Sequence, residues 1–169
     1  MSKLASILRA PPLMALGFVA ALSLAPPQAR AAAGGPFQKF MGEWTGAGQV
    51  ISRNGTREAI RCRAEFSGAQ DGEALNQTIV CASPSYRIDI QSSAEAVGDS
   101  VHGAWREETR NVSGQLSGRV ADGRFVGAVR GSGFTAGVSL NSNGRRQGVN
   151  IEPSGGNIAD VSIELERRG

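Results

Sequence analysis

Few residues in this chain are of a type and spacing that could perform chemistry. His102 is the only histidine, so a histidine metal site or a serine–histidine–acid triad would depend on it alone. Glu107 and Glu108 resemble a carboxylate pair for glycoside cleavage, but neighbouring strand residues point to opposite faces, which prevents convergence. We interpret the pair as surface charge near a turn and His102 as a solvent-facing strand residue. We therefore expect no catalytic residue, no metal site and no enzymatic activity.

The only two cysteines, Cys62 and Cys81, lie on two strand-like runs separated by a turn. Free thiols or half of a metal site are the alternatives, but partner ligands are lacking, so we predict a disulfide across a β-hairpin. An antiparallel register through this bridge leaves 69–74 as the turn and places apolar residues on one face. It sets three further pairs opposite each other: Ala64 and Ile79, Phe66 and Gln77, and Gly68 and Leu75.

The first 31 residues have the order of a secretory signal peptide. Lys3 and Arg9 precede an apolar run over 13–25, and small residues follow it. We predict cleavage after Ala31, with Ala33 as the second choice and a buried or amphipathic N-terminal helix as the alternative. The apolar run is too short to span a bilayer comfortably, so we expect no transmembrane segment and a periplasmic or secreted location.

The net charge of +3 for the full chain arises from this predicted leader. Without Lys3, Arg9 and Arg30, the chain has 15 basic and 15 acidic residues, and Lys39 is the only lysine among them. A nucleic-acid-binding domain would keep a basic excess for phosphate contacts, so we expect no nucleic-acid partner. The remaining length suits one domain, which we expect to be a monomer.

Apolar and polar residues alternate along most of the remaining chain, in short runs separated by turn signals such as Asn54-Gly55 and Asn143-Gly144. This pattern predicts an all-β, antiparallel up-and-down meander of about ten strands. We favour a closed small β-barrel over 42–168, and a two-layer β-sandwich is the alternative. Residues 32–41 are expected to form a flexible lead-in or a short helix, and the alternative for 37–41 is that they simply close the end of the domain. A weaker strand is expected to end at Pro153.

Two features resemble lipocalin-type barrels: Gly42-x-Trp44 on the first strand and the late arginines Arg167 and Arg168. The resemblance implies a lipocalin-like barrel in which a late arginine packs on the tryptophan. The pattern Gly42-x-Trp44-x-Gly46-x-Gly48 also resembles nitrobindin-like haem barrels. Because the only histidine falls on the opposite alternation from the apolar residues of its strand, we expect no haem and no other cofactor.

A broader resemblance is to uncharacterised exported proteins of Gram-negative bacteria. It rests on segments such as Arg61-Cys-Arg63, Cys81-Ala-Ser-x-Ser-Tyr-Arg87 and Gly103-x-Trp105-x-Glu107. The resemblance implies an exported protein and supplies no activity.

Two functions from different classes remain open. In the first, the barrel interior encloses a small apolar ligand; the alternative is that the same side chains fill a solid core. The candidate lining residues are Trp44, Phe66, Tyr86, Trp105, Phe125 and Phe134. In the second, an arginine-rich exterior binds an anionic glycan, a lipid head group or a protein of the cell envelope; the alternative is an ion-paired, solvated surface. The candidate contacts are Arg61, Arg63, Arg87 and Arg106.

Overall fold

The computed structural model describes residues 34–69 and 71–169. The predicted signal peptide and its cleavage sites lie outside these residues. Among the described residues, no helix is long and apolar enough to cross a membrane.

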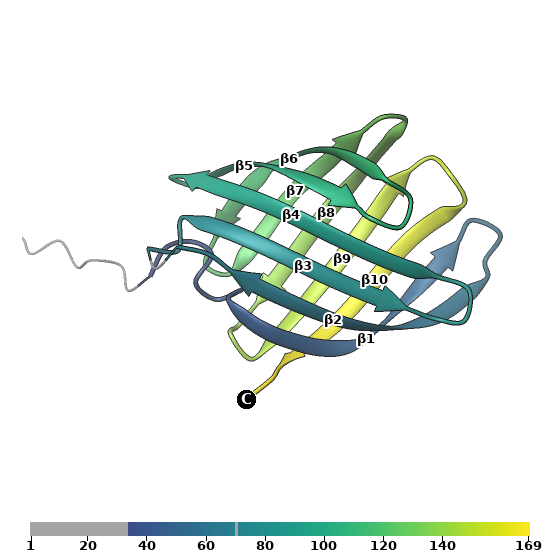
Figure 1. The fold of residues 1–169 in the computed structure, drawn as a ribbon, viewed down its shortest axis with the longest axis horizontal. Coiled ribbons are helices and arrows are strands. Elements are labelled where there is room, and N and C mark those ends of the chain that lie inside the picture. Colours follow the sequence, from purple (N-terminus) through teal and green to yellow (C-terminus); the bar gives the residue numbers. More distant parts are fainter. Residues whose placement is uncertain (1–33, 70) are drawn as a thin grey trace, which may run out of the picture. The chain divides into compact units, whose positions relative to one another are not determined.

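The described residues form ten antiparallel strands in a closed barrel (Figure 1). Each strand pairs with its neighbours in the sequence, and β1 pairs with β10 to close the ring. The predicted up-and-down barrel is therefore confirmed, and the sandwich is excluded. The strands are β1 Gly42–Ser52, β2 Arg57–Ser67, β3 Ala74–Ala82, β4 Arg87–Val97, β5 Ser100–Glu107, β6 Val112–Ala121, β7 Arg124–Gly131, β8 Phe134–Ser142, β9 Arg146–Ser154 and β10 Ile158–Arg167.

The period-2 pattern decides which side chains enter the barrel. On β2, Ile60 and Phe66 are buried, whereas Arg61, Arg63 and Glu65 between them are exposed. Successive side chains of a strand point to opposite faces, so the apolar set faces the interior and the charged set meets water. Closure pairs every strand on both sides, which leaves no exposed sheet edge.

The predicted hairpin register is confirmed over β2 and β3. Cys62 lies opposite Cys81 and the two are joined by a disulfide, with Cα atoms 4.1 Å apart. The ladder runs from Arg61 to Ser67 on β2, so the expected pair Gly68–Leu75 lies just beyond it. The bridge therefore joins two inward-facing positions of neighbouring strands.

Glycines allow the β1–β10 seam to close tightly. A Cβ atom on Gly46 would lie 1.9 Å from the backbone oxygen of Glu164, and one on Gly48 would lie 2.4 Å from that of Ser162. Real Cβ atoms do not approach a backbone that closely, so any other residue would push the two strands apart. The absence of a side chain at these two positions therefore lets β1 and β10 approach closely.

Pro153 does not end its strand, contrary to the sequence expectation. β9 continues to Ser154, and Pro153 lies opposite Ala136 of β8. Its carbonyl accepts a hydrogen bond from the Arg53 guanidinium at 3.0 Å, on the side away from β8. A residue's N–H and C=O point to the same side of a strand, and the β9–β10 ladder stops at Ile151. The missing N–H of proline therefore costs no ladder bond.

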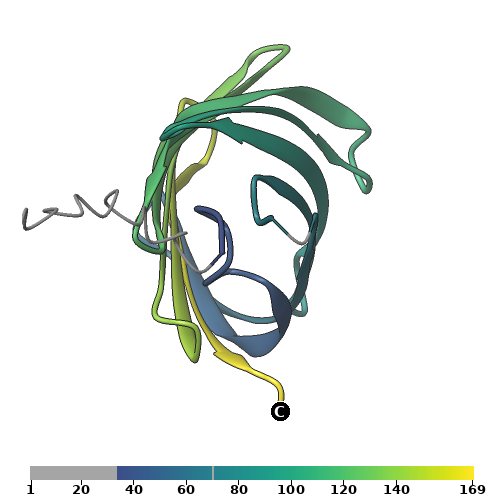
Figure 2. The same cartoon turned by 90° about the vertical axis from the view of Figure 1, so that its left-hand side faces the viewer.

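One end of the barrel is closed by a turn over residues 36–40, hereafter the plug. Phe37 and Phe40 are 2% and 1% exposed and belong to the core. The amide of Phe37 donates to the Gly72 carbonyl at 3.1 Å, and the Lys39 carbonyl accepts from the Ser142 hydroxyl at 2.6 Å. Figure 2 views this end and shows the plug inside the ring of strands. The segment is a turn rather than a helix, and it closes the barrel.

Candidate functional site: an internal cavity

The interior of the barrel is not filled. A cavity of about 400 Å³ lies along it, bounded at one end by Phe37 and Phe40 of the plug. At the other end its wall includes Arg110 and Ser132, which are exposed, so the cavity reaches the surface there. We call this the open end. Most of the wall is aliphatic or aromatic, with contributions that include Leu75, Ile79, Ile90, Leu116, Val138 and Ile151.

Four of the six aromatic residues predicted to line the interior do so. Phe66, Trp105, Phe125 and Phe134 are part of the cavity wall. Trp44 and Tyr86 are not, and this corrects the sequence expectation for both.

Trp44 supports the closed end instead of lining the cavity. Its indole nitrogen Nε1 donates to the Phe40 carbonyl at 2.8 Å, which ties β1 to the plug. The Arg167 guanidinium lies 5.0 Å from the ring centroid, within range of a cation–π contact. The packing of a late arginine on this tryptophan, implied by the lipocalin resemblance, is therefore present, and Arg167 belongs to β10.

Tyr86 lies in the β3–β4 turn. Its amide donates to the Ser83 hydroxyl at 2.9 Å, and its carbonyl accepts from the Ser83 amide at 2.8 Å. In the sequence, Tyr86 alternates with Ile88 and Ile90, which line the cavity. Because the strand begins only at Arg87, that alternation does not extend to the tyrosine.

Trp105 differs from Trp44 in its hydrogen bonding. It is 9% exposed, and its Nε1 is buried without a hydrogen-bond partner among the described residues. Its ring packs edge-on against Phe134 with the centroids 5.7 Å apart. An unpaired buried donor costs roughly 1–3 kcal/mol, so this position is not explained by stability alone.

Trp105 is the last member of a polar row that crosses three strands of the wall. Gln77 of β3 lies opposite Ser92 of β4, and Ser92 lies opposite Trp105 of β5. All three line the cavity, and Gln77 and Ser92 are half-buried. Within the described part of the chain, their side chains make no hydrogen bonds. We call these three residues the polar row.

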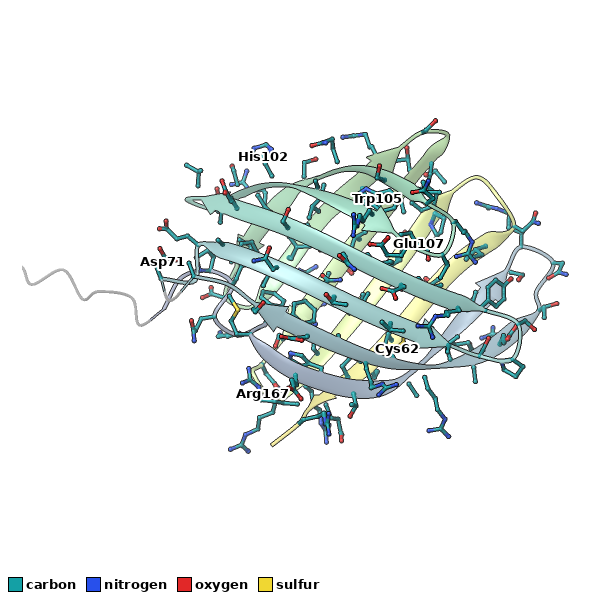
Figure 3. The ribbon with its side chains drawn as sticks, in the orientation of Figure 1. Cys62, Asp71, His102, Trp105, Glu107 and Arg167 are labelled. Atoms are coloured by element: carbon teal, nitrogen blue, oxygen red, sulfur yellow. A yellow bond between two sulfur atoms is a disulfide. The ribbon has the colours of Figure 1, made fainter. Side chains whose placement is uncertain are left out.

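Glu107 is buried in the cavity wall, which corrects its interpretation as surface charge. It is 7% exposed, and it faces inward two residues beyond Trp105 on β5 (Figure 3). The carboxylate accepts hydrogen bonds from the amides of Arg110 at 2.7 Å and Asp89 at 3.1 Å, and from the amide and hydroxyl of Thr109. Burial by itself would raise the pKa of Glu107, but these hydrogen bonds outweigh it and lower the pKa.

The charged groups of the cavity wall neutralise each other. Glu107 and Arg110 are the charged residues that line it, and their side chains form an ion pair at 3.5 Å. The Arg110 guanidinium also donates to the Arg87 carbonyl at 3.4 Å. The period-2 pattern that places Trp105 inside also places Glu107 inside, and this signal could have located it. Glu108 is exposed, so the two carboxylates do not converge, as expected.

The candidate anion-binding arginines are distributed over the outer face. Arg87 pairs with Asp89 at 3.9 Å, and Arg106 pairs with Glu108. Arg61 and Arg63 are exposed on β2 on either side of the inward-facing Cys62. Two of the four named arginines are thus already engaged with carboxylates.

Metal chemistry has little support among the described residues. They contain no group of three or more histidine, cysteine, aspartate or glutamate side chains that could hold a metal ion. His102 is exposed on the outside of β5, as predicted (Figure 3). Cys62 and Cys81 are buried as a disulfide outside the cavity lining.

Gln147 is a buried polar residue that the sequence analysis did not single out. It is fully buried on β9, and both polar atoms of its amide lack a partner among the described residues. It lies opposite Leu165 and Ser142 near the closed end, and it is not part of the cavity wall. A ligand in the cavity therefore does not contact it directly.

The chain thus forms a closed, ten-strand, antiparallel up-and-down β-barrel with an internal cavity. No protein-family model and no curated protein matches the sequence. Among solved structures, the chain resembles Rv2717c from M. tuberculosis, with a TM-score of 0.63 and 10% identity over 78% of this chain and 94% of the other. It also resembles the S-type phycobiliprotein lyase CPES from Guillardia theta, with a TM-score of 0.52 and 12% identity over 79% and 90% of the two chains. At these identities the likeness concerns the fold.

Proposed function

We propose that this protein is an exported, non-enzymatic β-barrel that binds one small apolar ligand in its interior. The observation that carries the proposal is the apolar cavity of about 400 Å³ closed by Phe37 and Phe40. Small-molecule pockets typically measure about 300–1,000 Å³, so the space suits a compact ligand. Water inside such walls finds few partners, and an apolar ligand gains about 25 cal/mol for each Å² of apolar surface that it buries.

The arginine-rich exterior supports the envelope-binding alternative less well. Arg87 and Arg106 would have to give up carboxylate partners before contacting an anionic glycan or lipid head group. The cavity needs no such exchange, because its wall is already shaped and mostly apolar.

The test compares a valine-to-phenylalanine substitution inside the cavity with the same substitution on the outer face. Val138 lines the cavity on β8, whereas Val126 is 47% exposed on β7. We expect Val138→Phe to weaken binding of the neutral fluorescent probe N-phenylnaphthylamine about tenfold, because the larger ring takes up part of the space that the probe needs. Val126→Phe should bind like the wild type.

Native mass spectrometry of protein purified from its own host provides a second readout. A co-purified small molecule that is lost in Val138→Phe and retained in Val126→Phe would support the proposal. Equal probe binding by the two variants, or no probe binding by the wild type, would contradict it.

A further inference from the structure

The polar row lies in a cavity wall that is otherwise mostly apolar. Gln77, Ser92 and Trp105 are consecutive cross-strand neighbours. The Trp105 indole nitrogen is buried without a partner among the described residues, and the half-buried Gln77 and Ser92 side chains border the cavity beside it. Half-buried amide and hydroxyl groups favour hydrogen-bonding partners. In the empty barrel, water must supply them, and a ligand that enters the cavity displaces this water.

The chemistry of the row favours a neutral hydrogen-bonding group. The glutamine amide and the serine hydroxyl both donate and accept, and the indole N–H donates only. A hydrocarbon has no acceptor, so it could satisfy none of these donors. A ligand that displaces ordered water without replacing its hydrogen bonds loses affinity, so a pure hydrocarbon is disfavoured. A carbonyl oxygen accepts from two neighbouring donors and suits the row.

The charges at the open end disfavour an anionic head group. Glu107 and Arg110 are the charged residues of the cavity wall, and each compensates the other at 3.5 Å. Arg87, at the same end, is paired with Asp89. A carboxylate ligand would meet the buried Glu107 carboxylate and find no free guanidinium in the wall. Its desolvation would therefore remain uncompensated.

We infer that the ligand is a neutral amphipathic molecule, with an apolar body and one carbonyl-type acceptor that hydrogen-bonds to Gln77 and Ser92 of the polar row. Trp105 flanks the acceptor and offers a third donor. The inference rests on the proposed function and specifies its ligand class. It distinguishes the cavity from one that takes hydrocarbons or free fatty acids.

The experiment uses three ten-carbon probes: decane, methyl octyl ketone and decanoate at neutral pH. Their affinities are measured by displacement of N-phenylnaphthylamine from the full chain. The test variant is Gln77→Leu/Ser92→Ala. Its control is Asn76→Leu/Ser93→Ala, because Asn76 and Ser93 form the adjacent cross-strand pair on the outer face. The ratio of ketone to decane affinity is taken within each protein, which removes the effect of any change in the overall hydrophobicity of the cavity.

We expect the wild type and the control to prefer the ketone over decane. In the test variant, the ketone-to-decane ratio should fall about tenfold. The ketone loses two hydrogen bonds, whereas decane no longer displaces water from polar side chains. Its thermal stability without ligand should be unchanged or higher, because polar groups without protein partners are removed. Decanoate should bind the wild type more weakly than the ketone.

An unchanged ketone-to-decane ratio in the test variant, with both probes still bound, would overturn the inference and leave the proposed function standing. Tighter wild-type binding of decanoate than of the ketone would overturn the neutral ligand class. Failure of every probe to bind the wild type would overturn the proposed function itself.

Discussion

The two ends of the barrel each contain a buried tryptophan, and the two are used differently. At the closed end, the Trp44 indole donates to the Phe40 carbonyl and packs under Arg167. Toward the open end, the Trp105 indole is buried without a partner among the described residues and continues the polar row of Gln77 and Ser92. A satisfied polar group indicates a structural role. An unsatisfied one in a cavity wall indicates a place where something else binds.

The comparison predicts that equivalent substitutions will affect stability at the closed end and binding toward the open end.

The plug provides the largest expected effect. Phe40 is 1% exposed, and Phe40→Ala should lower the free energy of unfolding by about 3–5 kcal/mol because it leaves a void. Phe134→Ala, at the open end of the cavity, should cost clearly less because Phe134 is only half-buried, so less packing is lost. Urea denaturation measures both, and equal losses would contradict the distinction.

The disulfide should contribute to stability and not to binding. It closes a span of 19 residues, so Cys62→Ser should lower the free energy of unfolding by about 3 kcal/mol. Because neither cysteine lines the cavity, N-phenylnaphthylamine should bind normally below the new melting temperature. Thermal denaturation and probe titration are the measurements. An unchanged melting temperature would show that the bridge does not constrain the unfolded chain.

The two tryptophans allow a matched substitution at each end. Trp44→Phe leaves the Phe40 carbonyl without its donor and should cost about 1–3 kcal/mol of stability. Trp105→Phe removes a donor that has no partner in the described part of the chain, so the stability change should be smaller. Binding of methyl octyl ketone should show the reverse order. A larger stability loss for Trp105→Phe would remove the basis of the comparison.

The smallest effect concerns acid sensitivity. The pKa of Glu107 lies below its usual value of 4.5, so its contribution is complete above pH 4.5 and is lost as the pH falls through the lowered pKa. Glu107→Gln should therefore flatten the acid-induced loss of stability below about pH 4.5. Glu58, whose pKa the Ser83 hydroxyl lowers, still contributes to the acid-induced loss of stability in this variant. Denaturation series across this range, with Glu108→Gln as the control, measure the change. Parallel curves for wild type and Glu107→Gln would contradict it.

The fold was predictable because two independent patterns agree. Period-2 alternation identifies the inward face, and the spacing of Cys62 and Cys81 selects the one register that keeps apolar residues on that face. A one-residue slip would move every side chain to the opposite face. Residues on the strand interiors, such as Phe66 and Phe125, were therefore placed correctly in the cavity wall.

The site was less predictable because alternation does not give depth along the barrel. Trp44 and Trp105 both face inward, but only the closed structure shows that one supports the plug and the other borders the cavity. Strand ends caused the remaining errors. Tyr86 falls just outside β4, and Glu107 is the last residue of β5 rather than part of the turn. Alternation with Trp105 does place Glu107 on the inner face. The hydrogen-bond partners of Glu107 and Tyr86 depend on which neighbouring loops reach them, and the sequence contains no local signal for that.

The seam between β1 and β10 also has consequences for the order of folding. Every other ladder joins strands that are adjacent in the sequence, whereas this one joins residues as far apart as Trp44 and Arg167. Such a contact carries a large loop-closure cost and is expected to form late. The nine hairpins can assemble as an open, curved sheet before it forms. The cavity, which needs a complete ring, therefore comes into existence only at the final step of folding.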